Sequence, residues 1–221
     1  LDAVAAVPGI ERIRFTTSHP KDLDDAVIAR FASLPQLCPA LHLPVQSGSD
    51  DILRRMGRRY DVAAYLTLVD KLRRACPDIA LTSDFIVGFP GETRADFEAT
   101  LELVRKVGFD SGFSFMYSDR PGTASEKLAP KILPEEKSAR LAELQALLDE
   151  RLTASLAARL GRREVVLIEG ESRREGSLGA AWRGRDPGGR VVNVPLPAGA
   201  DHTGSFVAVR IVQAKKHSLI G

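Results

Sequence analysis

The segment IALTSDFIVGFPGET, residues 79–93, decides the fold class of this chain. Its first nine residues are mostly apolar, with several β-branched or aromatic side chains, which predicts a strand, and two glycines and a proline then predict a tight turn. Thr93 follows, with Asp96 three residues later, a variant of the capping box that opens a helix, and Gly108 is placed to end that helix. One apolar stripe of the helix is predicted to be buried: Phe97, Leu101 and Val104. A strand, a turn and a helix in this order predict an α/β architecture.

The same alternation extends to both sides of this segment. Further strands are predicted over residues 12–15, 40–45 and 112–117, and helices over residues 22–33, 49–56 and 61–75. This order predicts parallel strands joined by right-handed crossovers. A closed (β/α)8 barrel needs roughly 250 residues, far more than this region holds. The prediction is therefore a small open sheet or a part of a barrel.

The predicted strand over residues 12–15 forms one edge of that sheet. Parallel strands are normally paired on both edges and covered on both faces. This strand would lack a neighbour on one side, so its Ile13 and Phe15 would face solvent or another molecule. The chain starts at Leu1 without a Met or a signal peptide, which indicates a cut inside a longer protein. We therefore expect the chain to self-associate through this edge.

The C-terminal part of the chain has a different pattern. Residues 118–133 form a loop that contains proline and glycine, and Pro134 begins a helix that ends before Gly161. That helix carries a stripe of leucines: Leu141, Leu144, Leu148, Leu152 and Leu156. Short β-branched runs then predict a small all-β barrel, with strands over residues 165–168, 191–194 and 206–212. The predicted domains are residues 1–133, a connecting helix over 134–160, and residues 161–221.

Charge and cysteine content limit the function classes. The net charge is +2, but residues 161–221 hold 10 Lys and Arg against 6 Asp and Glu. This favours an anionic partner for the C-terminal part, although a solvated surface would explain the charge alone. Cys38 and Cys76 have no neighbouring cysteine, so they predict buried apolar side chains, no metal site and a reducing, cytoplasmic location. No apolar run has the roughly 18 residues that span a bilayer, so no membrane partner is expected.

Polar residues gather where three predicted strands end, at residues 44–50, 84–93 and 117–123. In parallel α/β folds the functional site lies at these ends. Ser47 offers a hydroxyl beside a helix start, which favours a polar or anionic ligand, although Ser49 or Asp50 in the same segment could simply cap the helix.

The other two strand ends offer one charged candidate each. Asp84 is a carboxylate within an apolar strand, which is costly unless it contacts a ligand or is tied to a neighbouring strand. Arg120 could bind phosphate or carboxylate, or could be a solvated turn residue.

Taken in order, these segments closely resemble the tRNA methylthiotransferases of the MiaB type, which are radical S-adenosylmethionine enzymes. The matching stretches are TSHPK (17–21), LHLPVQSGSD (41–50), MGRRY (56–60), DFIVGFPGET (84–93) and YSDRPGT (117–123). The last domain resembles the TRAM domain of that family through GR (184–185), RVVN (190–193) and SLIG (218–221). One departure is Gly189, where the family pattern has asparagine.

The resemblance implies the C-terminal part of a partial (β/α) barrel of the radical SAM type, followed by a small TRAM barrel. It implies S-adenosylmethionine as cofactor and two 4Fe–4S clusters in the full-length protein, whose cysteine ligands, including a CxxxCxxC motif, are absent from this chain. This chain alone is therefore expected to be inactive. The implied partners are the anticodon stem-loop of tRNA and a reducing electron donor.

Site residues follow from the same resemblance. The implied cofactor-binding residues are Gln46, Ser47, Asp84, Ile86 and Gly88. The implied RNA or substrate contacts are Arg58, Arg59, Arg120, Arg185 and Arg190. Alanine at Asp84 or Ser47 is expected to impair radical formation. Arg190 is expected to reach solvent beside a turn, so that alanine there would weaken RNA binding and leave the fold intact.

Three substrate branches of the family remain open. The loop around Arg120 favours methylthiolation at C2 of an N6-isopentenyl-type adenosine beside the anticodon. Threonylcarbamoyl adenosine is the close alternative, and a ribosomal-protein aspartate is less favoured. A non-catalytic RNA-binding module is the alternative from a different class.

Overall fold

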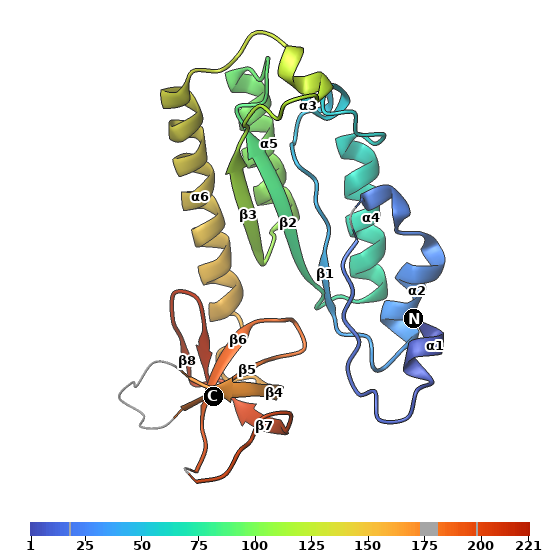
Figure 1. The fold of residues 1–221 in the computed structure, drawn as a ribbon. Coiled ribbons are helices and arrows are strands. Elements are labelled where there is room, and N and C mark those ends of the chain that lie inside the picture. Colours follow the sequence, from blue (N-terminus) through green and yellow to red (C-terminus); the bar gives the residue numbers. More distant parts are fainter. Residues whose placement is uncertain (18, 173–180, 198) are drawn as a thin grey trace. The chain divides into compact units, whose positions relative to one another are not determined.

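The computed structural model describes residues 1–17, 19–172, 181–197 and 199–221, which form two compact units, Leu1–Arg151 and Leu152–Gly221 (Figure 1). Ser18 of the TSHPK stretch lies outside the described residues. The long helix α6 (Pro134–Ala157) begins in the first unit and ends in the second. Each unit has its own core, so each is described by itself.

The first unit is built on a parallel three-stranded sheet in the order β1-β2-β3. The strands are β1 (Ala40–His42), β2 (Ala80–Val87) and β3 (Ser111–Met116). The longer helices are α2 (Asp25–Ser33), α4 (Val62–Ala75) and α5 (Arg94–Val107), and shorter ones are α1 (Asp2–Ala5), α3 (Asp50–Arg55) and the 3-10 turns η1 (Pro20–Asp22) and η2 (Ala124–Lys127). The α/β prediction is thus confirmed.

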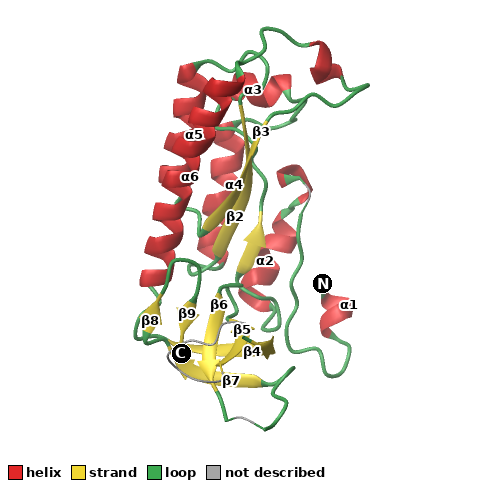
Figure 2. Ribbon diagram, turned by 60° about the vertical axis from the view of Figure 1, so that its left-hand side comes forward, coloured by secondary structure: helices red, strands yellow, loops and turns green. Residues whose placement is uncertain are grey.

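Helices cover one face of this sheet, and the other face is open (Figure 2). Along β2, burial alternates from Leu81 onward: Leu81, Ser83, Phe85 and Val87 are buried, and the residues between them are half-buried. On β3, Phe113 and Phe115 stand on the open face with 60% and 53% of their surface exposed. Because side chains alternate along parallel strands, the face of the sheet that no helix covers carries polar and aromatic groups. We call this uncovered face the inner face of the sheet.

Local sequence signals placed the helices well. Thr93 and Asp96 form the expected capping box of α5, and Gly108 ends the helix in the left-handed conformation with φ 60°. Burial would raise the pKa of Asp96, but hydrogen bonds from Ser49 and Thr93 outweigh it and lower the pKa, so the cap is a carboxylate. The predicted stripe of α5 is buried, and α4 likewise buries Tyr65, Val69 and Leu72.

The prediction of an exposed edge strand over residues 12–15 is wrong. This segment forms only isolated parallel bridges, Ile13 with Leu37 and Thr16 with His42. Ile13 is 7% exposed, and Phe15 is half-buried with its ring centroid 5.9 Å from that of Phe31. The helix that follows folds back over the segment, which the periodicity of the segment itself does not reveal.

The second predicted strand is shorter than expected. Strand β1 ends at His42, because Pro44 has no N–H to continue the ladder. The backbone nevertheless runs on beside β2: the Leu43 and Gln46 N–H groups donate to the carbonyls of Thr82 and Asp84 at 2.8 and 2.9 Å. Residues 43–46 therefore keep the direction of β1 and reach the edge where the site lies.

The second unit contains one six-stranded sheet in the order β7-β4-β5-β6-β9-β8. The strands are β4 (Arg163–Glu171), β5 (Ala181–Arg185), β6 (Val191–Pro195), β7 (Phe206–Arg210), β8 (Gln213–Ala214) and β9 (Leu219–Ile220). The first and last strands of this order, β7 and β8, are separated by only two residues, so the sheet must curl around its core, as predicted for a small barrel. Its core contains Trp182 and Leu156, the latter from α6.

Sequence patterning missed β5, which holds two arginines and a glycine in five residues. Gly184 is required there by close packing: a Cβ at this position would lie 2.3 Å from the Leu167 carbonyl oxygen. The strand exists because neighbours on both sides pair with it, and not because of its own propensity.

Candidate active site at the strand ends

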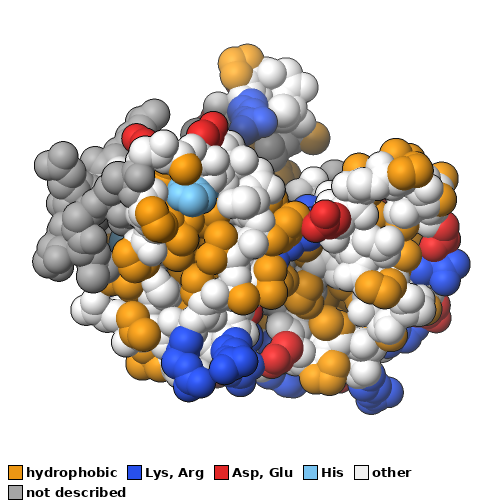
Figure 3. Space-filling view, turned by 90° about the horizontal axis from the view of Figure 1, so that it is seen from below, with side chains coloured by type: hydrophobic (Ala, Val, Ile, Leu, Met, Phe, Trp, Pro, Cys, Tyr) orange, Lys and Arg blue, Asp and Glu red, His pale blue; other side chains and the backbone are white. Residues whose placement is uncertain are grey.

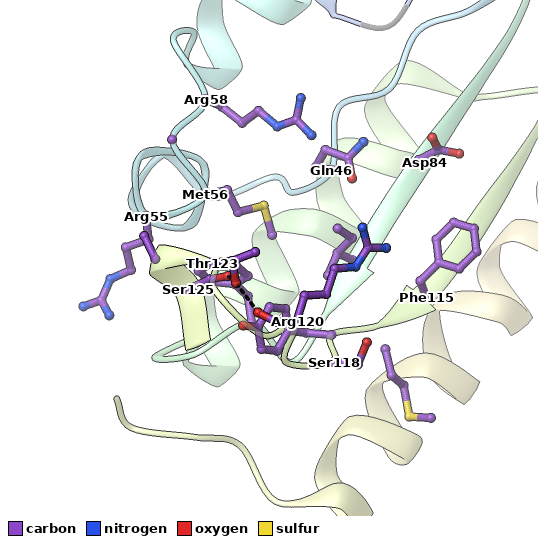
Figure 4. Close-up of a pocket in the computed structure, with 16 residues that line it drawn as sticks. Gln46, Arg55, Met56, Arg58, Asp84, Phe115, Ser118, Arg120, Thr123 and Ser125 are labelled. Atoms are coloured by element: carbon purple, nitrogen blue, oxygen red, sulfur yellow. Dashed lines mark hydrogen bonds between the residues drawn. The ribbon is translucent and has the colours of Figure 1, made fainter. Parts of the chain in front are cut away.

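A pocket of about 760 Å³ lies at the carboxyl ends of the parallel strands of the first unit. Parallel strands bring their carboxyl ends to one edge, so segments distant in sequence meet here. The lining residues come from the ends of β1, β2 and β3, from the segment after α3 and from the loop after β3: Gln46, Arg55, Met56, Gly57, Arg58, Asp84, Ile86, Phe89, Phe115, Met116, Tyr117, Ser118, Arg120, Thr123, Ala124 and Ser125. Figure 4 shows this pocket.

Gln46 is held in a strained backbone conformation at the pocket. Its φ is 75°, and it is the only non-glycine residue with positive φ among the described residues. The strain is imposed by pairing with β2, since its N–H donates to the Asp84 carbonyl and its carbonyl accepts from Ile86, both at 2.9 Å. The residue is 7% exposed, and its side-chain amide finds no hydrogen-bond partner within the described part of the chain. Backbone strain and an amide that lines the pocket both point to a ligand contact.

Asp84 lies on the inner face of the sheet beside His42. Its Oδ2 lies 3.2 Å from His42 Nε2, and His42 Nδ1 lies 2.9 Å from the Thr82 hydroxyl. Thr82 is the register partner of His42 across β1 and β2, so the pairing of the strands places all three together. Asp84 is therefore tied to a neighbouring strand, as one of the two interpretations predicts, and its carboxylate also lines the pocket. Sequence reasoning missed His42. Because successive side chains of a strand point to opposite faces, its position in the strand would have placed it on the inner face.

Two of the predicted cofactor-binding residues do not line the pocket. Ser47 is fully buried, and its hydroxyl accepts from the Ser49 N–H at 3.2 Å and lies 3.4 Å from the Thr100 hydroxyl. Ser49 accepts from the Ile52 N–H as the N-cap of α3, in line with the simpler interpretation of this segment. Gly88 has φ 71° and donates its N–H to Glu92 Oε2 at 2.7 Å. Both residues therefore stabilise the strand ends through hydrogen bonds and do not contribute to the surface of the pocket.

Apolar and aromatic groups form the wall of the pocket. Ile86 and Phe115, register partners on β2 and β3, stand side by side on the inner face. Phe89 packs edge-on against Tyr117, with ring centroids 4.9 Å apart. A flat apolar wall with a few polar groups at its rim is typical of a site for a planar ring that carries a polar tail.

Arginine side chains enter this pocket from two segments. Arg58 and Arg120 extend into the opening, whereas Arg55 points away from it (Figure 4). The Arg120 carbonyl accepts from the Thr123 hydroxyl at 2.8 Å, which fixes the turn that carries this side chain. Arg59 is exposed and does not line the pocket. The structure therefore brings Arg58 and Arg120 together and leaves Arg59 outside.

Tyr60 anchors the segment that carries Arg58. Its hydroxyl donates to the Val45 carbonyl at 2.9 Å, and burial raises the pKa of this phenol to about 12. The group therefore stays a neutral donor at every physiological pH. The end of β1 and the Arg58 segment are thus fixed relative to each other.

The expected solvent-reaching position of Arg190 is wrong. Its side chain is 8% exposed and pairs with Asp186, which is fully buried, at 3.2 Å. The Arg190 N–H also donates to the same carboxylate at 2.7 Å. Arg190 stabilises the turn from inside, because a buried carboxylate needs a paired cation. Arg185 remains partly exposed, with Nε 3.0 Å from Glu169.

The second unit presents a different basic surface. Arg163 on β4 and Arg210 on β7 are exposed and lie directly opposite each other in the sheet. Like charges opposite each other destabilise a sheet unless an anion neutralises them. On the same face, Val165 is 46% and Phe206 is 37% exposed. Sequence reasoning missed this surface, because it depends on the register of strands that are far apart in sequence.

Figure 3 shows one face of the molecule on which lysine and arginine side chains form small separate groups between hydrophobic and uncharged surface. On the coloured part of that face, positive charge is therefore not gathered in one continuous patch.

No metal-binding group of three or more His, Cys, Asp or Glu side chains occurs among the described residues. Cys38 is buried, and burial raises the pKa of Cys76, so Cys76 is not disposed to be a thiolate ligand. The described residues thus do not fit an iron–sulfur cluster. Within the described chain, no helix has the length and apolar character to cross a membrane.

Comparisons with known proteins agree with the fold. Residues 1–104 match the Radical SAM superfamily, and residues 157–221 match the TRAM domain. Coproporphyrinogen III oxidase from Escherichia coli, a radical SAM enzyme, aligns structurally over 76% of this chain and 36% of its own, with TM-score 0.53 and 20% identity. The first part of the chain therefore has the radical SAM fold, and the last part is a TRAM domain.

Curated relatives narrow the family. The tRNA-2-methylthio-N(6)-dimethylallyladenosine synthase of Nitratidesulfovibrio vulgaris is 54% identical over 100% of this chain and 49% of its own length. The enzyme of the same name from Oleidesulfovibrio alaskensis is 49% identical over 100% of this chain and 51% of its own. The chain belongs to the MiaB-type methylthiotransferase family, and it spans about half the length of these relatives.

Proposed function

We propose that this chain is part of a tRNA-2-methylthio-N6-dimethylallyladenosine synthase, and that it supplies one wall of the active site together with a tRNA-binding TRAM domain. The observation that carries the proposal is the pocket at the strand ends, in a chain 54% identical to a protein of that name. The dimethylallyl substrate is favoured over threonylcarbamoyl adenosine, because both of these relatives carry the dimethylallyl name.

The pocket suits the adenosyl group of S-adenosylmethionine. Ile86 and Phe89 offer an apolar wall, while the Gln46 amide and the Asp84 carboxylate are available for polar groups of the ligand. When bound, S-adenosylmethionine supplies the radical that removes hydrogen from the adenosine C2. The residues of this chain bind and orient that ligand, with Ser47 and Gly88 supporting the strand ends from behind.

The remaining parts of the proposal concern partners. Two 4Fe–4S clusters would be held by residues outside this chain and reduced by an electron donor, in the cytoplasm. The anticodon stem-loop of tRNA would contact Arg58 and Arg120 at the pocket, with Arg59 and Arg185 as outer contacts. Residues 134–160 would connect the catalytic part, 1–133, to the RNA-binding part, 161–221.

Substrate conversion tests the proposal directly. The full-length protein, anaerobically reconstituted with iron and sulfide, is expected to convert N6-dimethylallyladenosine in tRNA to its 2-methylthio derivative. Nucleoside mass spectrometry of digested tRNA measures the product. Conversion of threonylcarbamoyl adenosine instead, with dimethylallyl tRNA unchanged, would overturn the assignment of substrate.

The paired arginines of the second unit predict how tRNA binds. Replacing Arg163 and Arg210 together with glutamine is expected to weaken tRNA binding and to flatten its dependence on salt. For each phosphate that is no longer neutralised, the slope should fall by about one log unit of affinity per log unit of salt. Affinity would be measured for chain 1–221 by filter binding over a salt series.

Arg74→Gln is the matched control, since Arg74 is an exposed arginine of the first unit. Equal salt slopes for the wild type and for the double variant would place the phosphate contacts elsewhere.

A further inference from the structure

A buried ion pair joins helix α6 to the turn that follows β2. Arg140 on α6 is 3% exposed and Glu92 is 2% exposed. Arg140 Nη1 donates to Glu92 Oε2 at 2.6 Å and to the Glu92 carbonyl at 3.0 Å. The same Oε2 accepts from the Gly88 N–H at 2.7 Å. One carboxylate oxygen therefore binds both the helix and the first residue of the turn.

Lys137, one turn earlier on α6, makes a second connection. Its Nζ donates to the Tyr117 carbonyl at 3.0 Å and lies 5.3 Å from the centre of the Tyr117 ring. Its aliphatic stem crosses directly over Gly88: a Cβ on Gly88 would lie 2.4 Å from Lys137 Cγ. Any side chain at Gly88 would displace the lysine, and φ 71° already favours glycine there.

These two connections hold residues that line the pocket. The turn held by Arg140 follows Ile86 and contains Phe89, and Tyr117 follows the last residue of β3. Phe89 and Tyr117 contact each other edge-on, so the two connections meet at one aromatic pair. We call Lys137, Arg140, Glu92 and Gly88 the α6 clamp. Neither Lys137 nor Arg140 lines the pocket itself.

We propose that Lys137 and Arg140 are positioning residues of the active site, which hold the apolar wall formed by Ile86, Phe89 and Tyr117 in the shape that receives the adenosyl group. The inference rests on the proposed function of the pocket. It extends the site to the helix that leads into the TRAM domain, although this helix contributes no group to the ligand surface.

The chemistry of the clamp explains why its loss would reach the pocket. Burial raises the pKa of Glu92, while the Gly88 N–H and Arg140 act in the opposite direction. Without the guanidinium, Glu92 would be a poorly compensated buried carboxylate that must take up a proton or turn toward water. Turning toward water breaks the hydrogen bond from the Gly88 N–H, and proton uptake weakens it because a neutral carboxyl group is a poorer acceptor, so either response loosens the turn that carries Phe89.

The test uses the full-length protein with reconstituted clusters and S-adenosylhomocysteine as the probe. Arg140→Gln and Lys137→Met are each compared with Glu143→Gln. Glu143 forms an exposed pair with Arg94 that also joins α6 to α5, at 2.8 Å, away from the pocket. Equilibrium dialysis gives the Kd for the probe, and thermal unfolding gives the Tm, with dialysis carried out well below the lowest Tm.

Arg140→Gln is expected to weaken probe binding by about tenfold or more, as loss of a charged hydrogen bond implies, and Lys137→Met by less. Glu143→Gln should bind as the wild type does. Wild-type Kd values for both clamp variants would overturn the inference while leaving the proposed function intact. Failure of the wild-type protein itself to bind the probe would overturn the proposed function and the inference with it.

If Arg140→Gln does not fold, Lys137→Met decides, because methionine keeps the stem over Gly88 and removes only the ammonium group. Unchanged probe affinity in that variant would then overturn the clamp as a positioning device. A second readout separates positioning from general stability: the KM for S-adenosylmethionine should rise in the clamp variants, whereas impaired folding would lower the amount of active enzyme at unchanged KM.

Discussion

Replacing Arg190 with methionine is expected to destabilise the second unit, Leu152–Gly221, by about 3–5 kcal/mol. The side chain pairs with Asp186, which is fully buried, and it lies 3.4 Å from the Ser155 hydroxyl. Methionine fills much of the same volume but removes the guanidinium that pairs with this carboxylate. The cost is therefore electrostatic and not the cost of a cavity.

Denaturant unfolding of chain 1–221 measures this effect cleanly. Trp182 is the only tryptophan of the chain and lies in the core of the second unit, so its fluorescence reports on that unit. The double variant Asp186→Asn with Arg190→Met should recover part of the stability, because no buried charge is then left unpaired.

Arg210→Met controls for removal of an arginine as such, since Arg210 is exposed. An Arg190→Met midpoint equal to that of the wild type would show that the pair contributes nothing to stability. In that case Arg190 would again be a candidate for RNA contact.

Local signals explain what could be predicted of the fold. The capping box of Thr93 and the left-handed Gly108 act within a few residues, so the sequence is sufficient to bound α5. Strand β5 could not be predicted, since Gly184 is there to let another strand approach, and that approach belongs to the tertiary fold. The covered position of Ile13 likewise depends on Leu37, which lies far along the chain.

The site was predictable to the level of strand ends and not of side chains. The rule that parallel sheets bind ligands at their carboxyl ends selected Asp84 and the segment 44–50, the family resemblance singled out Gln46 within that segment, and both residues line the pocket. It could not separate Gln46 from Ser47, because the positive φ of Gln46, which decides where the two side chains point, is imposed by pairing with β2 and not by the local sequence. The pair of Arg163 and Arg210 needs the strand register, which no motif encodes.

Asp84→Asn is expected to lower formation of 5′-deoxyadenosine by the reconstituted full-length protein by about tenfold or more, the effect of losing a charged hydrogen-bond acceptor. Asparagine keeps the size of the side chain and its contact with His42, so the sheet should remain intact. What changes is the charge that the carboxylate presents to the pocket. Chromatography of the nucleoside product measures the effect, with iron content measured alongside.

Ser47→Ala is the matched control for Asp84→Asn. Ser47 lies in the segment that follows the neighbouring strand β1 but is fully buried, with its hydroxyl near Thr100 and the Ser49 N–H. Its alanine variant should lose stability, by about 1–3 kcal/mol for the donor left unpaired, while the folded fraction cleaves S-adenosylmethionine at the wild-type rate. If Asp84→Asn also cleaves at that rate with full iron content, Asp84 is only a tie between β1 and β2, and ligand binding at this end of the sheet depends on Gln46 and the aromatic wall.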